Sequence, residues 1–313
     1  MEAFFFFLVE QYLDKLKCID LKGSFNLVKT PEFIGVPRLE RLYLSGCSNL
    51  VEIHPSIGQL RRLVVLDLKG CQSLTNFPSI TTEMQSLTIL NLCGCSKISK
   101  IPEFKGIMKS LSELYLGETA IERLPSSIEC LTALTILNLK DCKNLKCLPG
   151  NMDSLRSLEI FVLSKCSKLA NLPENFWKIK CLKELNLSGI SQLEGTWLNA
   201  VAGFSSLKSL KLRANNFVTL PASISQLSEL EVLDLYDCFW LQSLPKLPSS
   251  VRYINAEGCR CLEPSPALLK IGFFSRTCSQ MRCNGESNYG VAFTILNRYL
   301  QVIFFSSLSF SLE

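Results

Sequence analysis

A nine-residue phrase recurs along most of this chain, and no other feature limits its possible folds as strongly. Residues 63–71 read LVVLDLKGC, residues 87–95 read LTILNLCGC and residues 158–166 read LEIFVLSKC. Each phrase follows the pattern L-x-x-L-x-L-x-x-C, with an apolar residue three places on and then usually a proline. Such self-similarity at a fixed period is not produced by chance and indicates stacked structural repeats.

The repeat unit occurs eleven times between residues 16 and 263, at spacings of 21 to 25 residues. Positions four and six of each unit are apolar, which is the period of two expected of a β-strand. One short strand cannot bury its apolar face alone, so the units are predicted to stack in parallel around a shared core. Position one is occupied by Leu16, Leu39, Leu63, Leu87, Leu111, Leu134, Leu158, Leu182, Leu207, Leu230 and Val251.

The second half of most units begins at or near a proline, as at Pro125 and Pro221. Proline restricts the chain to extended or helix-start geometry, so short helical, 3₁₀ or irregular segments are expected on the return path. The predicted fold is therefore an α/β leucine-rich-repeat solenoid, with a curved parallel sheet on its concave side and these segments on its convex side.

The repeat divides the chain into three parts. Residues 16–263 are predicted to form the repeat domain, and residues 1–15 a short N-terminal cap or a truncation scar. A cap this short is expected of a fragment or a truncated gene product, because terminal repeats need covering. Residues 264–313 follow the last unit and are expected to act as a C-terminal cap.

Fifteen cysteines would suit a disulfide-bonded secreted protein, but the N-terminus does not look like a signal peptide. Glu2 stands where positive charge is needed, and no small-residue cleavage site follows Val9. No stretch reaches the roughly 18 apolar residues that span a membrane. A reducing location is therefore predicted, in the cytoplasm with the nucleus as a second location, and the cysteines are expected to be thiols.

Seven of the cysteines share position nine of their units, where Ser24, Thr119 and Asn215 also occur. A small residue able to hydrogen-bond suits a point where the chain turns inward after the strand, so a structural role is predicted. A zinc or disulfide ladder is the alternative, although the C-x-x-C pairing typical of zinc sites is missing. The seven are Cys47, Cys71, Cys95, Cys142, Cys166, Cys238 and Cys259, and Ile190 departs from the pattern in the eighth unit.

Other chemistry has little support in the sequence. The single histidine, His54, occurs where other units carry proline and is predicted to lie in a turn. No phosphate-binding G-x-x-x-x-G-K-[ST] loop occurs. Cys261, Cys278 and Cys283 lie outside the regular pattern, and together with Cys259 they leave a four-cysteine metal site as a minor alternative. We therefore predict no enzyme activity, no cofactor and no metal.

The concave side of the sheet, which we call the open face, carries positions three, five and seven of each unit. Positions two, three, five, seven and eight of all units together hold eleven basic and twelve acidic residues, which is a net charge of −1. That balance disfavours nucleic acid and suits a protein surface of mixed sign. Apolar side chains on such a surface often mark a contact, so we expect a protein partner here. The candidate partner-binding residues are Asp20, Tyr43, Asp67, Ile89, Asn91, Tyr115, Ile136, Asn138, Ile160, Val162, Asn186, Lys211, Arg213, Asp234, Tyr236 and Asn255.

Three phrases make a more specific comparison possible. Residues 39–57 (LERLYLSGCSNLVEIHPSI), residues 247–259 (LPSSVRYINAEGC) and residues 292–301 (AFTILNRYLQ) resemble plant intracellular immune receptors. The similar class carries a Toll/interleukin-1-receptor-like (TIR) domain and a nucleotide-binding domain ahead of its repeats. The last phrase resembles the start of that class's post-repeat jelly-roll domain, so residues 264–313 are expected to be its truncated beginning.

The resemblance implies a function in plant innate immunity. In that class the repeats recognise pathogen effectors, or host proteins altered by them, and restrain the nucleotide-binding domain at rest. This chain contains neither of the preceding domains, so NAD cleavage and nucleotide switching are assigned to none of its residues. The alternative is a stand-alone intracellular leucine-rich-repeat scaffold that bridges signalling proteins, but such proteins have more uniform units with asparagine at position nine.

Overall fold

The computed structural model describes residues 13–80, 83–190 and 201–263. The chain divides into two units, residues 1–275 and 276–313, and the second lies outside the described residues. The predictions for the N-terminal cap up to residue 12, for the C-terminal cap and for Cys278 and Cys283 also fall outside them.

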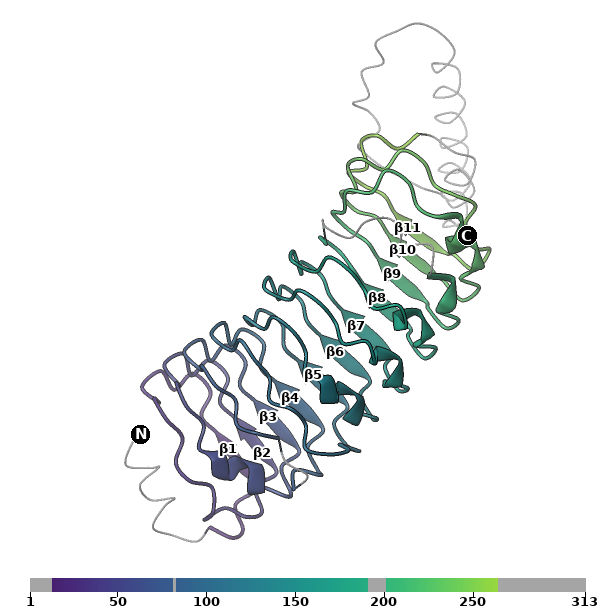
Figure 1. The fold of residues 1–313 in the computed structure, drawn as a ribbon. Helices are drawn as coiled ribbons and strands as arrows, with labels where there is room; N and C mark the ends of the chain where they lie inside the picture. The colour runs from purple at the N-terminus through teal and green to yellow at the C-terminus, as the bar shows by residue number, and fades with distance from the viewer. Residues whose placement is uncertain (1–12, 81–82, 191–200, 264–313) are drawn as a thin grey trace, which may run out of the picture. The chain divides into compact units, whose positions relative to one another are not determined.

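Eleven short parallel strands form one sheet, in which each strand lies between its neighbours in sequence (Figure 1). Each is three residues long and comprises positions three to five of one repeat, so that position four lies within the strand and position six directly after it. The strands are β1 (Cys18–Asp20), β2 (Arg41–Tyr43), β3 (Val65–Asp67), β4 (Ile89–Asn91), β5 (Glu113–Tyr115), β6 (Ile136–Asn138), β7 (Ile160–Val162), β8 (Glu184–Asn186), β9 (Ser209–Lys211), β10 (Val232–Asp234) and β11 (Tyr253–Asn255).

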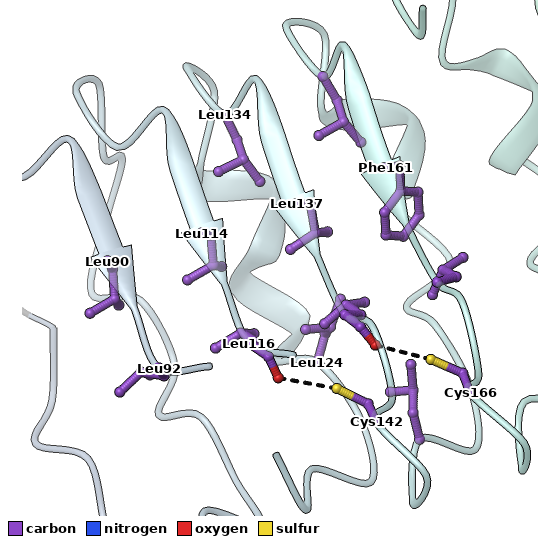
Figure 2. Close-up of a cluster of buried hydrophobic side chains, with 14 of the residues drawn as sticks. Leu90, Leu92, Leu114, Leu116, Leu124, Leu134, Leu137, Cys142, Phe161 and Cys166 are labelled. Carbon is purple, nitrogen blue, oxygen red and sulfur yellow. Dashed lines mark hydrogen bonds between the residues drawn. The ribbon is translucent and has the colours of Figure 1, made fainter. Parts of the chain in front are cut away.

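The strands pair in a register that aligns equivalent positions. Leu66 pairs with Leu90, and Leu137 pairs with Phe161, so position four of one unit lies beside position four of the next. These four side chains are fully buried. Figure 2 shows Leu90, Leu137 and Phe161 on the same side of their strands. Full burial of one such side chain contributes about 1.5–3 kcal/mol, and the repeat supplies several in every unit.

Backbone hydrogen bonds continue past the strands into the following loop. The Leu44 N–H donates to the Asp67 carbonyl at 2.8 Å, and the Gly46 N–H donates to the Lys69 carbonyl at 2.7 Å. Equivalent bonds link most neighbouring units, so adjacent repeats are held together through positions six and eight as well as through their strands.

Short 3₁₀ helices occupy the return path in several units, as the prolines predicted. Pro55 begins η1, and Pro125 and Pro221 immediately precede η2 and η6. Each of these three helices turns one isoleucine into the core. The described helices are η1 (Pro55–Gln59), η2 (Ser126–Cys130), η3 (Met152–Ser154), η4 (Phe176–Lys178) and η6 (Ala222–Gln226).

Position eight of every unit has a positive φ angle. The values run from 51° at Ala214 to 80° at Gly258. This left-handed conformation turns the chain out of the strand, and it costs about 1–2 kcal/mol for residues that carry a Cβ atom. Six units use glycine there, whereas five place Glu118, Asp141, Lys165, Ala214 and Asp237 in the same conformation.

We predict that Ala214→Gly raises the free energy of unfolding by roughly 0.5–1 kcal/mol, because it removes a strained Cβ from a left-handed position. Gly70→Ala should have the opposite effect by about 1 kcal/mol, since Gly70 has a φ of 74° and its added Cβ would meet nothing closer than 3.8 Å. Urea unfolding of both variants checks the pair. If the free energy of unfolding changed by the same amount and in the same direction in both variants, the effect would not come from the backbone conformation.

Candidate protein interface

The open face carries an aliphatic band across β3–β7. Its side chains alternate with the buried leucines and stay partly exposed, because successive residues of a strand point to opposite sides. Ile136 and Ile160 pair directly in register, and Val162 follows in β7. The structure thus brings together four of the candidate residues and adds one that the candidate set lacks. The band consists of Val65, Ile89, Ile136, Ile160 and Val162.

Position five divides into two groups with different contacts. In seven units an Asp or Asn carboxyl or amide oxygen accepts a hydrogen bond from the N–H two residues later, as Asn138 Oδ1 does from Lys140 at 2.9 Å. These Asx turns close the strand end, so the side chains have a structural duty that the repeat pattern did not reveal. The seven are Asp20, Asp67, Asn91, Asn138, Asn186, Asp234 and Asn255.

The other four position-five residues are Tyr43, Tyr115, Val162 and Lys211, which make no such turn. The Tyr115 hydroxyl donates to Glu113 Oε2 at 2.7 Å. Burial, together with this carboxylate, raises the pKa of Tyr115 to about 12, so the phenol keeps its proton. The ammonium of Lys22 lies 4.2 Å from the centre of the Tyr43 ring.

Charged residues of β8–β10 and of the loop after β9 neutralise one another. Lys211 Nζ lies 2.7 Å from Glu184 Oε1, and Arg213 Nε lies 2.6 Å from Asp234 Oδ2. Arg213 also lies over the Tyr236 ring at 5.4 Å. Asp234 is only 6% exposed, so its carboxylate presents little surface to a partner. This part of the open face is thus a paired polar surface beside the aliphatic band.

We predict that Asn138→Ala lowers the free energy of unfolding by about 1 kcal/mol, since the Lys140 N–H loses its acceptor. Val162→Ala should cost less, because Val162 is partly exposed and closes no turn. Thermal unfolding of the two variants, which alter the same position in neighbouring strands, checks the division. An equal loss in both would show that the Asx turn adds nothing.

Position nine forms a ladder of thiol hydrogen bonds. The Cys142 thiol donates to the Leu116 carbonyl, and the Cys166 thiol donates to the Leu139 carbonyl, each at 3.1 Å (Figure 2). Each bond runs from one unit to position six of the unit before it. The predicted structural role is therefore confirmed. Equivalent bonds are made by Cys47, Cys71, Cys95, Cys238 and Cys259.

Asn215, one of the substitutes at position nine, satisfies the equivalent backbone carbonyl of the preceding unit and further backbone groups as well. The amide of Asn215 donates to the carbonyls of Leu187 and Leu212 at 3.0 and 2.9 Å. Its oxygen accepts from the Ile190 N–H at 2.9 Å. The unit that lacks a polar residue at position nine is thus completed by the asparagine of the next unit.

Cys142 and Cys166 of the ladder are held as protonated thiols in this arrangement. Burial raises the pKa of Cys142 to about 11 and that of Cys166 to about 12. All cysteines within the described residues are free, and these residues contain no cluster of three or more His, Cys, Asp or Glu side chains able to hold a metal. His54 was predicted to lie in a turn, but it is the extended N-cap residue of η1, and its Nδ1 contacts the Ser56 hydroxyl at 2.8 Å.

The raised thiol pKa values predict a loss of stability at alkaline pH. An unfolded thiol titrates near about 8.5, whereas Cys142 and Cys166 stay protonated in the fold. Above that pH the unfolded state binds fewer protons, so the free energy of unfolding falls by at most about 1.4 kcal/mol per pH unit for each thiol.

The control is Cys142→Ser/Cys166→Ser, because a serine hydroxyl can donate to the same carbonyls without titrating. Urea unfolding under reducing conditions, from pH 8 to about 10.5, should give a shallower decline for the double variant. Parallel curves would contradict a contribution from these thiols.

Comparison with known proteins identifies the family. A model of the leucine-rich repeats of RPS4B-like disease resistance proteins matches residues 83–270, which is more than half of the chain, and a general leucine-rich-repeat model matches residues 38–60. The chain belongs to the leucine-rich-repeat family of RPS4B-like disease resistance proteins. The resemblance to the repeat region of plant TIR-type immune receptors is confirmed.

Individual relatives agree with the family assignment. The disease resistance-like protein DSC1 of Arabidopsis thaliana is 33% identical, over 81% of this chain and 24% of its own length. The TMV resistance protein N of Nicotiana glutinosa is 34% identical, over 79% of this chain and 26% of its own length. This chain therefore spans about a quarter of the length of these relatives.

Solved structures confirm the solenoid fold. The leucine-rich repeat domain of the type III effector XopL superposes with a TM-score of 0.59 at 23% identity, covering 81% of each chain. The functional domain of InlJ from Listeria monocytogenes, which includes a cysteine ladder, superposes with a TM-score of 0.50 at 20% identity, over 81% of this chain and 56% of its own. None of the described helices has the length and apolar composition needed to cross a bilayer.

Besides Val65, the candidate set also lacked Glu113 of the open face. Glu113 is position three of its repeat unit and the first residue of β5, between Ile89 and Ile136 in the neighbouring strands. Comparison of the position-three residues of successive repeats shows that the neighbours of Glu113 on both sides are aliphatic. Its lack of a counter-charge could only be seen once the side chains were placed.

Proposed function

We propose that this chain is a protein-binding leucine-rich-repeat module of plant innate immunity, without enzymatic activity. Its open face binds a pathogen effector, or a host protein altered by one, in the cytoplasm or nucleus. In a full-length receptor the same domain contacts the nucleotide-binding domain and restrains it at rest. Membership of the disease resistance family supports this assignment.

The aliphatic band is the observation that carries the proposal. Its five side chains lie on consecutive or nearby strands whose register holds them in fixed positions. Apolar side chains gathered on an otherwise polar surface are typical of an interaction site. The paired backbone underneath makes this surface rigid, so little conformational entropy is lost when a partner binds.

The charges around the band favour a protein over nucleic acid. The two ion pairs of β8–β10 consume basic side chains that phosphate groups would otherwise contact. The remaining positions balance positive and negative charge. A protein partner of mixed charge fits such a surface, whereas a polyanion requires clustered, unpaired basic residues.

We predict that Ile136→Asp/Ile160→Asp weakens partner binding at least tenfold, because about 1.4 kcal/mol is enough for that loss and the change places two charges in the apolar contact. Ile107→Asp is the matched control: Ile107 is 59% exposed and lies outside the strands. Binding is measured pairwise against a panel of pathogen effectors and receptor nucleotide-binding domains, and circular dichroism verifies folding.

Unchanged binding by the double variant, or equal weakening by Ile107→Asp, would contradict the assignment of the open face. Binding confined to host signalling proteins, with no effector or nucleotide-binding domain recognised, would favour the scaffold alternative instead.

A further inference from the structure

A single carboxylate interrupts the aliphatic band. Glu113 pairs in register with Ile89 on one side and with Ile136 on the other. Its side chain is only partly exposed, so it shares the surface formed by these two isoleucines. A partner that covers the band must also cover this carboxylate.

Glu113 lacks a counter-charge within the part of the chain that the structure describes. Its one hydrogen bond comes from the Tyr115 hydroxyl, which donates to Oε2 at 2.7 Å. The phenol holds the carboxylate in place and stays neutral, so the negative charge is not cancelled. Oε1 receives no hydrogen bond from a described residue.

Glu184 provides the internal comparison. It occupies the same position three, in β8, and its Oε1 lies 2.7 Å from Lys211 Nζ. Glu184 is therefore neutralised by its own neighbour, whereas Glu113 is not. The two acids occupy equivalent places in the repeat, yet only Glu113 offers a charge to a partner.

We propose that Glu113 is a specificity-determining residue of the open face, which binds a lysine or arginine side chain flanked by apolar residues in a partner protein. Apolar contacts with Ile89 and Ile136 would exclude water from the carboxylate. A buried carboxylate without a partner is costly, and a cation from the bound segment removes that cost. An acidic or purely apolar segment would be rejected for the same reason. This inference rests on the proposed function.

The test selects a random-peptide phage library on the purified full chain. Peptides enriched by the unmodified protein are expected to contain Lys or Arg beside apolar residues. Selection on Glu113→Lys should enrich peptides with Asp or Glu in place of the Lys or Arg, because the charge at residue 113 has been reversed. Glu184→Gln, the matched control, should enrich the same peptides as the unmodified protein.

A synthetic peptide from the first selection then serves as the probe for binding measurements. Glu113→Gln should weaken it at least tenfold, and Tyr115→Phe should weaken it less because the carboxylate remains. Circular dichroism verifies that each variant is folded. If Glu113→Lys is misfolded, the Glu113→Gln measurement decides the question by itself.

Three outcomes would overturn the inference: no basic peptides enriched on the unmodified chain, the same basic peptides enriched on Glu113→Lys, or unchanged affinity in Glu113→Gln. Ile136→Asp distinguishes the two proposals. If this variant abolishes peptide binding while Glu113→Gln does not affect it, only the role of Glu113 fails. If Ile136→Asp also has no effect, the open face is not the binding site and the proposed function fails with it.

Discussion

Parallel pairing between neighbouring repeats is the constraint on which the rest of this structure depends. A three-residue strand with one apolar face has no core of its own, so each unit is stable only against the next. Three features keep adjacent units in the same register: the strand bonds, the backbone bonds of positions six and eight, and the thiol bonds of position nine. The residue at position eight has a left-handed conformation that turns the chain. The cysteine thiol at position nine can then donate to a backbone carbonyl of the preceding unit.

Constant register turns each position of the repeat into a column across the sheet. Position four becomes the layer of buried leucines, and position three becomes the surface column that carries the aliphatic band. Position five performs two tasks. Where it is Asp or Asn it closes an Asx turn, as at Asn138, and where it is Tyr43, Tyr115, Val162 or Lys211 it closes no such turn.

The residues on neighbouring strands determine whether a charged side chain forms an ion pair. Glu184 and Glu113 are chemically identical and occupy equivalent positions, but the following strand offers Lys211 to the first and the neutral Asn138 to the second. An ion pair makes Glu184 part of the scaffold, and its absence leaves Glu113 with a charge available to a partner. Membership of the disease resistance family supports the proposed role of the open face, and this local electrostatic difference supports its proposed preference for a basic side chain.

The repeated pattern by itself determined the fold, the number and order of strands, the buried leucines and the structural role of position nine. It did so because a periodic sequence has one efficient way to bury periodic apolar residues. Only the tertiary structure decided which open-face residues are free. Asp20 and Asn138 look like surface residues in the sequence but are held by hydrogen bonds to their own backbone. Glu113 and Glu184 are indistinguishable until side chains from adjacent strands, more than twenty residues away in sequence, are placed at contact distance.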